Sequence, residues 1–239
     1  MAREKEGKVR KELVTLLMCG LSLSCPSAGA QSVPLAELEA RDLIRLADQP
    51  PGTGLPPDWR QRAVRGQKLP SSAIEDGQDD RVWVVSGTGT AGWFAFDRRD
   101  APISSNAILI LSSRLAQVPT ESDLTVPELS DSALRLFVIF ESQRAWLSRP
   151  RMIMYSFGRL GRDDPVAKPQ KALCDIRIPR GASRAWSLDA LRPGQDAIRL
   201  FDWTPQKIQA VGILLDSDQT RSFARADFRT LMAVQRRAQ

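Results

Sequence analysis

Two carboxylates and a hydroxyl alternate along the stretch that follows an apolar run near the C-terminal end of the sequence. The run AVGILL is followed directly by Asp216, Asp218 and Thr220. Such a D-x-D-x-T pattern at the end of a strand could hold a metal ion, attack a phosphate or bond to backbone amides in a turn. A phosphatase needs further Lys and acidic side chains downstream, and only nineteen residues follow Thr220. The phosphatase interpretation is therefore rejected.

Calcium is the next ligand that these side chains could take. Asp216, Asp218, Thr220 and Asp227 stand at positions 1, 3, 5 and 12 of an EF-hand spacing. Position 6 of that loop should be glycine, and the residue there is Arg221. Asp216 and Asp218 remain weak calcium candidates, and no other cofactor or metal is predicted. The residues alone favour a structural role, in which Asp and Thr side chains bond to backbone amides where the strand ends.

Histidine is absent from all 239 residues, and its absence limits the possible chemistry more than any motif does. Ser-His-Asp and Cys-His catalysis and His-containing zinc sites are excluded, because they depend on an imidazole. An enzyme would have to work with carboxylates, Lys, Tyr or Arg. The sequence therefore favours a protein that is not an enzyme, and it assigns no catalytic residue.

The first 30 residues have the pattern of a signal peptide. A basic head precedes the apolar run 13–25, which is too short to span a bilayer as a helix. The tripeptide AGA that ends at Ala30 fits a signal-peptidase site, so we predict cleavage there and a periplasmic or secreted product. Lipidation at Cys25 is the alternative. The mature chain is predicted to contain no transmembrane segment.

The mature chain is only mildly basic. Removal of residues 1–30 takes away five basic and three acidic side chains, which lowers the formal net charge from +6 to +4. The remaining basic residues are dispersed, so no nucleic-acid partner is predicted. Cys174 is the single cysteine of the mature chain, which rules out an intrachain disulfide and favours burial as a small apolar side chain. We expect a monomer.

Three segments are predicted along the chain: the signal peptide of residues 1–30, a helix and linker over residues 31–58, and one domain over residues 59–239. Leucines near helical spacing predict a short amphipathic helix over residues 35–47. The prolines and glycines of residues 50–57 predict a stiff linker. Beyond residue 59, seven apolar runs rich in Ile, Val, Leu and Phe predict strands, at residues 81–87, 92–97, 106–118, 132–141, 150–158, 171–179 and 207–216.

No crossover helices separate these strands, which predicts an all-β fold, an antiparallel β-sandwich with a short N-terminal helix. Pro193 and Gly194 are expected to break the one further helical pattern. The run from Gly87 to Gly92 matches G-x-G-x-x-G, but strand residues follow it instead of a helix. It is predicted to be a glycine-rich hairpin turn.

The second half of the chain resembles a bacterial secreted family, the uncharacterised domain-of-unknown-function family 3047. The strings SDSALRLFVIFE, MIMYSFG, DALRPGQDAIRLF and PQKIQAVGILLDSDQT carry the resemblance. The family's pattern is matched by Asp131, Arg135, Phe140, Tyr155, Asp196, Phe201, Pro205, Asp216, Asp218 and Thr220. The resemblance covers about residues 107–230. It implies a jelly-roll-like sandwich akin to carbohydrate-binding modules, and it implies no established activity.

The predicted function is non-catalytic binding of a glycan or another component of the cell envelope. Arginine forms bidentate hydrogen bonds, carboxylates accept from sugar hydroxyls, and aromatic rings stack on sugars. The candidate ligand-binding residues are Asp131, Arg135, Tyr155, Trp186, Asp216, Asp218 and Thr220. A structural ion pair between Asp131 and Arg135 explains those two residues equally well.

Two other functions stay open on the sequence. A glycoside hydrolase would need two carboxyl groups about 5–10 Å apart, and Asp131 and Asp216 are the pair that the sequence offers. A structural protein of envelope assembly would use the predicted N-terminal helix to dock its partner.

Overall fold

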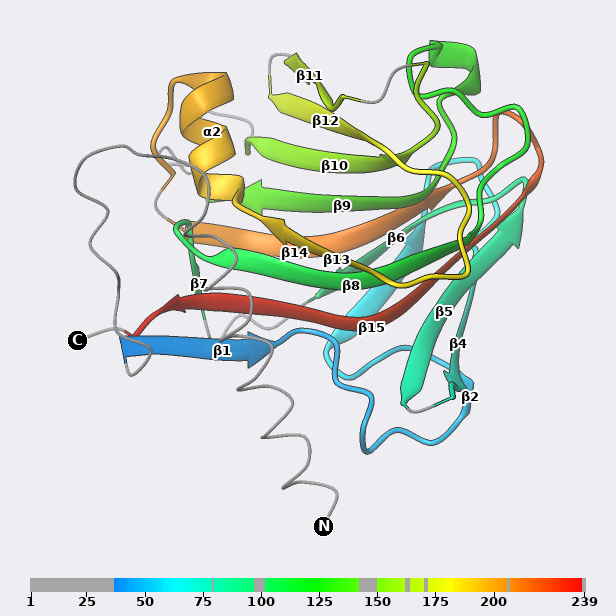
Figure 1. The fold of residues 1–239 in the computed structure, drawn as a ribbon, viewed down its shortest axis with the longest axis horizontal. Helices are drawn as coiled ribbons and strands as arrows, with labels where there is room; N and C mark the ends of the chain where they lie inside the picture. Colours follow the sequence, from blue (N-terminus) through cyan, green and yellow to red (C-terminus); the bar gives the residue numbers. More distant parts are fainter. Residues whose placement is uncertain are drawn as a thin grey trace. The chain divides into compact units, whose positions relative to one another are not determined.

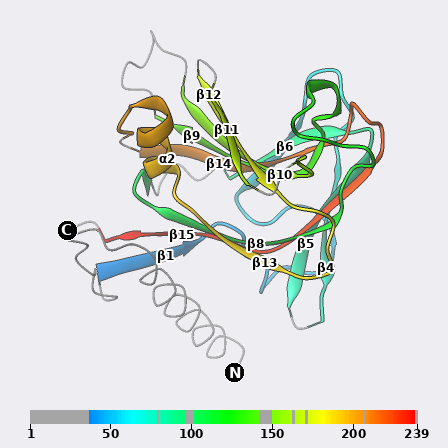
Figure 2. The same cartoon turned by 45° about the horizontal axis from the view of Figure 1, so that its top comes forward.

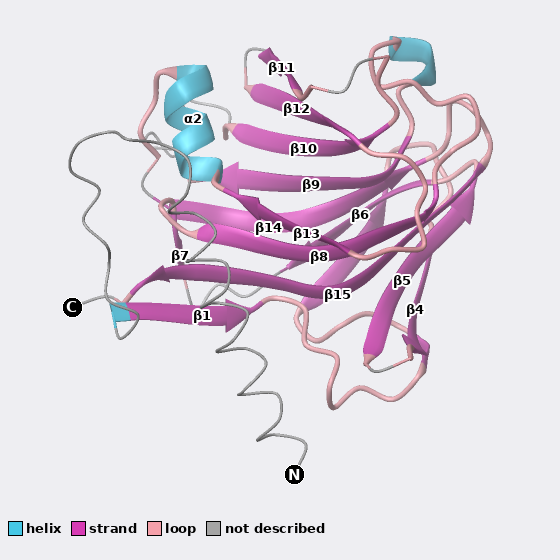
Figure 3. Cartoon of the chain, viewed as in Figure 1, coloured by secondary structure: helices cyan, strands magenta, loops and turns pink. Residues whose placement is uncertain are grey.

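The computed structural model describes residues 37–78, 80–96, 102–141, 150–161, 164–169, 172–205 and 207–237. The predicted signal peptide lies outside these residues. The described residues form fifteen strands in two sheets, a 3₁₀ turn at Pro127–Leu129 and one α-helix, α2, at Pro193–Phe201 (Figures 1 and 3).

Sheet A has seven strands among the described residues, in the order β13-β8-β15-β5-β4-β2, with β1 paired to β15. All of its strand pairs are antiparallel. Its strands are β1 (Leu38–Asp42), β2 (Gly52–Thr53), β4 (Ser71–Asp76), β5 (Arg81–Thr88), β8 (Ile108–Gln117), β13 (Ser187–Leu191) and β15 (Phe223–Arg236).

Sheet B has eight strands in the described part of the chain, in the order β11-β12-β10-β9-β14-β6-β3, with β7 paired to β14. Its pairs are antiparallel except for β10 and β12, which are parallel. Its strands are β3 (Trp59–Ala63), β6 (Ala91–Phe96), β7 (Ile103–Ser104), β9 (Ser132–Phe140), β10 (Met152–Gly158), β11 (Val166–Pro169), β12 (Leu173–Pro179) and β14 (Lys207–Asp216).

The core lies between the two sheets, which form separate layers (Figure 2). Aromatic rings fill its centre, where the ring of Trp83 lies 4.8 Å from Trp59, 5.7 Å from Phe94 and 5.3 Å from Phe228. Alternate residues of each strand point inward, so the remaining residues face away from the core. This arrangement confirms the predicted jelly-roll-like β-sandwich.

The predicted N-terminal helix is wrong, because the described part of its segment contains β1. Leu38–Asp42 pairs with the last strand, with Leu38 opposite Arg236 and Asp42 opposite Met232. Leu43 and Ile44 follow in a bend, and both of their backbone N–H groups donate to the carbonyl of Leu231. Leu43 and Leu46 are buried, and pairing with the edge of β15 imposes a strand where spacing alone suggested a helix. Since β2 also joins sheet A, the sandwich starts before the predicted boundary at residue 59.

Helix α2 forms where two residues were expected to break it. Pro193 stands at its first turn, where its missing N–H costs nothing and its fixed φ suits the helix. Gly194 packs against the backbone of Ser105, since an added Cβ would lie 2.0 Å from that carbonyl oxygen. The helix ends at Asp202, whose φ of 48° is left-handed.

The glycine-rich turn at Gly89 is a corner between the sheets and not the predicted hairpin. β5 belongs to sheet A and β6 to sheet B, so the chain changes layer there. Gly89 has a φ of +57°, which glycine adopts without steric cost. Ser217 fixes the corner, because its N–H donates to the Thr90 carbonyl over 2.8 Å and its hydroxyl accepts from the Thr90 N–H over 3.1 Å.

Candidate functional site

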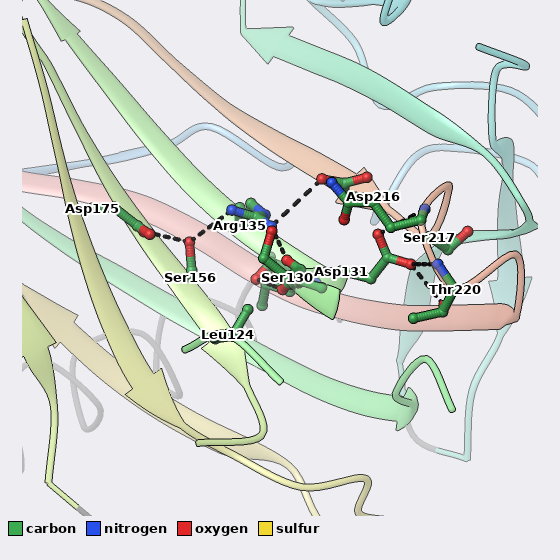
Figure 4. Close-up of polar contacts among 12 residues, drawn as sticks. Leu124, Ser130, Asp131, Arg135, Ser156, Asp175, Asp216, Ser217 and Thr220 are labelled. Atoms are coloured by element: carbon green, nitrogen blue, oxygen red, sulfur yellow. Dashed lines mark hydrogen bonds and ion pairs between the residues drawn. The ribbon is translucent and has the colours of Figure 1, made fainter. Parts of the chain in front are cut away.

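Five of the seven predicted site residues meet at one end of sheet B, and Figure 4 labels four of them, Asp131, Arg135, Asp216 and Thr220. Asp131 directly precedes β9, and Asp216 ends the neighbouring strand β14. A register shift between Leu214 and Asp216 interrupts the pairing of these two strands. The turn after Asp216 then returns Asp218 and Thr220 toward Asp131, so that residues 131 and 216–220 form one cluster.

The Asp131 carboxylate organises this turn. One oxygen accepts from the backbone N–H of Gln219 over 3.2 Å. The other accepts from the N–H and the hydroxyl of Thr220, each over 2.7 Å. The Thr220 hydroxyl also lies 2.8 Å from that of Ser222. Because Asp131 is fully buried and both oxygens are occupied, its role is to hold the turn.

Arg135 stands on β9 and points away from the core, beside the acidic cluster. Its guanidinium lies 3.5 Å from the Asp216 carboxylate and donates to the carbonyl of Ser130. The predicted alternative, an ion pair between Asp131 and Arg135, is not what the structure contains. Arg135 is 7% exposed, so this cation is fixed beneath the surface.

A chain of polar side chains continues from Arg135 across the same face of sheet B. Arg135 lies 3.5 Å from the Ser156 hydroxyl, which donates to Asp175 over 2.6 Å. Arg177 donates to Asp175 over 2.8 Å and also to the carbonyl of Leu124. Sequence reasoning missed Ser156, Asp175 and Arg177. The sequence pattern that could have identified them is the presence of polar residues inside otherwise apolar strands.

Asp216 has the most perturbed carboxyl group of the cluster. Burial raises its pKa to about 7, and the neighbouring carboxyl groups of Asp218 and Asp131 raise it further, against the opposing effect of Arg135. The Asp216 side chain is 16% exposed, and Asp218 is half-buried. The Asp216 carboxyl group therefore exchanges its proton near neutral pH.

Three carboxyl groups of the cluster lie close enough together to be considered as ligands for a cation. Asp131, Asp216 and Asp218 each offer an oxygen, and these oxygens lie within 4.8 Å of one another. Calcium takes six to eight oxygen ligands. Here the oxygens of Asp131 accept from protein donors, and the Arg135 cation lies beside Asp216. Only Asp216 and Asp218 could ligate freely, so the residues fit calcium poorly.

The EF-hand spacing has no structural counterpart. Asp227, at its position 12, lies on sheet A, where it is fully buried and ion-paired to Arg114 and Arg225. It is therefore not part of the cluster.

The other two predicted site residues lie elsewhere. Tyr155 is on the core side of β10, and its hydroxyl donates to Asp196 of α2 over 2.6 Å. Trp186 precedes β13 of sheet A and contacts Arg114 and Arg229. A single site that contains all seven residues therefore does not exist.

The chain was compared with known protein families, curated proteins and solved structures. No protein-family profile matches the chain, and no curated protein matches it. The described part of the chain contains no helix of the length and hydrophobicity that a membrane span requires.

Three solved structures illustrate the similarity of fold. The family 11 carbohydrate-binding module of the cellulase Lic26A-Cel5E of Clostridium thermocellum is 11% identical, with a TM-score of 0.43 over 82% of this chain and 94% of that one. Endoglucanase Cel12A of Rhodothermus marinus is 13% identical, with a TM-score of 0.42 over 79% and 100%. The family 12 xyloglucanase of Bacillus licheniformis is 10% identical, with a TM-score of 0.40 over 83% and 100%. Similarities of this size assign neither a ligand nor an activity to this chain.

Proposed function

We propose that this β-sandwich is a non-catalytic module that binds a glycan through Asp216 and Asp218. The observation that carries the proposal is that two partly exposed carboxyl groups lie side by side above a buried carboxylate, Asp131, whose two oxygens are both hydrogen-bonded. Sugar hydroxyls donate hydrogen bonds to carboxylates, and acceptors that are already fixed lose little entropy on binding.

Two residues support these carboxyl groups. Asp131 binds the turn that contains Thr220, and Arg135 lies beside Asp216 at the end of β14. Asp131 accepts from the backbone N–H and the hydroxyl of Thr220, and Arg135 donates to the carbonyl of Ser130, so these contacts need not rearrange when a ligand binds. A binding site with this kind of supporting layer keeps its geometry. The proposal includes export, since the signal peptide predicted for residues 1–30 would bring the module to envelope glycans, and it includes action as a monomer.

A hydrolase is the second candidate, and one observation favours it. A pKa of about 7 at Asp216 suits a general acid near neutral pH. The predicted partner Asp131, however, is fully buried with both oxygens occupied, whereas a glycosidase needs its second carboxyl group at the substrate. Asp218 is the remaining partner. We therefore place binding first.

A glycan array probed with the labelled protein tests the proposal, once with calcium and once with a chelator. We expect binding to a defined set of glycans under both conditions, with none of them cleaved. Absence of binding in both conditions would contradict the proposal and favour a structural role in the envelope. Release of shorter saccharides from a bound glycan would favour the hydrolase.

A further inference from the structure

Trp186 lies between two cations on sheet A, away from the site described above. The guanidinium carbon of Arg229 is 4.3 Å from the centre of its ring, and that of Arg114 is 4.9 Å away. Arg229 stands at a register shift of β15, between Phe228 and Thr230. The extra residue at this bulge is thus directed to the indole, which is half-buried.

The charges around Trp186 do not balance. Arg114 and Arg225 both bind the buried Asp227, with Nε–Oδ distances of 2.9 and 2.8 Å. Arg225 also contacts Glu75 over 2.8 Å. Arg229 forms no ion pair with any carboxylate of the described residues, and its Nε has no hydrogen-bond partner. One guanidinium therefore remains in excess.

The same face of sheet A continues to a second exposed ring. Phe223, Arg225 and Asp227 alternate along β15 and point away from the core, since Ala224, Ala226 and Phe228 point into it. Phe223 is 46% exposed. From Phe223 to Asp227 the strand spans about 13 Å, which is the length of a few sugar units.

We propose that this strip is a second binding surface, which takes an acidic saccharide that carries carboxylates. The free guanidinium of Arg229 would receive a carboxylate through two parallel N–H bonds, a geometry that lysine cannot supply. The rings of Trp186 and Phe223 provide apolar area at the two ends of the strip for sugar rings. The surface is opposite in charge to the cluster of Asp216 and Asp218, so it stands independently of the proposed function.

Calorimetric titration with a galacturonic acid hexamer tests this surface, with maltohexaose as the neutral probe. Arg229→Gln removes the unpaired charge, and Arg65→Gln is the matched control, because Arg65 is an exposed arginine in a turn of a different region. Trp186→Leu removes the ring. Thermal unfolding of each variant verifies that it is folded, and Arg229→Gln decides the result if Trp186→Leu is unstable.

We expect the acidic hexamer to bind at least about tenfold more tightly than maltohexaose, and Arg229→Gln to weaken that binding about tenfold. Arg65→Gln should leave it unchanged. Equal loss in Arg229→Gln and Arg65→Gln, or no preference for the acidic hexamer, would overturn the proposal. So would binding to phosphatidylglycerol vesicles without binding to the hexamer, since that result would identify an anionic lipid as the ligand.

Discussion

The Asp131 carboxylate accepts hydrogen bonds from both the backbone N–H and the hydroxyl of Thr220, each over 2.7 Å. This pair joins the start of β9 to the turn that follows β14, across 89 residues of sequence. It fixes the end of sheet B at which Asp216 and Asp218 lie.

Asp131→Asn should destabilise the protein. The amide group retains one acceptor oxygen and replaces the other with an NH₂ group, which then faces either the donor of Gln219 or the donors of Thr220. Hydrogen bonds to a charged group contribute about 1.5–3 kcal/mol each, so we expect the free energy of unfolding to fall by about 2–3 kcal/mol in urea denaturation. Thr220→Val should lose about 1 kcal/mol, and Thr220→Ser, which keeps the hydroxyl, should lose less. Unchanged stability of Asp131→Asn would show that the carboxylate does not hold the turn.

Stability should fall as the pH rises toward 8, because of Asp216. Its pKa is about 7 in the folded protein and about 3.8 as the ordinary value, so between these pH values the folded state holds a proton that the unfolded state has released. The contribution is complete below pH 4 and is lost as the pH passes 7. It is on the order of 2 kcal/mol, and Asp216→Asn should remove it.

Urea denaturation of the wild type and of Asp216→Asn between pH 5 and 8 measures this effect. The chain has no histidine, so no imidazole titrates in that window. Parallel pH profiles of the two proteins would be incompatible with a raised pKa at Asp216.

Calcium should change the stability very little. Both oxygens of Asp131 already accept hydrogen bonds, and Arg135 compensates part of the charge of Asp216. We therefore expect millimolar calcium, compared with chelator, to shift the melting temperature by less than about 1 °C. A rise of several degrees that disappears in Asp218→Asn would establish a calcium site and correct our interpretation of the donor set.

Tyr155→Phe tests the contact that fastens α2 to sheet B. The ring would stay in the core, while the hydrogen bond to Asp196 would be lost. We expect a loss of about 1–2 kcal/mol, since the acceptor is a carboxylate that keeps its ion pair with Arg199. In Tyr155→Phe, amide hydrogen exchange should also accelerate relative to the wild type, and it should accelerate more in α2 than in β9. Equal protection of α2 in both proteins would mean that packing alone holds the helix.

The sequence predicted the sandwich because the strand runs combine β-branched and aromatic residues with frequent turns. It could not predict β1, since the spacing of Leu38, Leu43 and Leu46 is compatible with helix and strand alike. Pairing with β15, almost 200 residues later in the sequence, decides between them. Pro193 was misjudged for a related reason, because proline breaks a helix in its interior and starts one at its first turn.

The cluster of Asp131, Arg135, Asp216, Asp218 and Thr220 was found in part because strand ends concentrate polar residues. Its pairing was not predictable, since Arg135 could reach an acidic group only through the register of β9 and β14. Trp186 was grouped with these residues on chemistry alone. Residue type does not specify which of two sheets an aromatic side chain lies on.

The central claim is that Asp216 and Asp218 bind a glycan, and calorimetry with a glycan selected on the array tests it most directly. The wild type is compared with Asp216→Asn and with Asp76→Asn, a matched change at a side chain that is 73% exposed on sheet A. Our account predicts that Asp216→Asn weakens the affinity at least about tenfold, while Asp76→Asn leaves it unchanged. Equal affinity of all three proteins would contradict it.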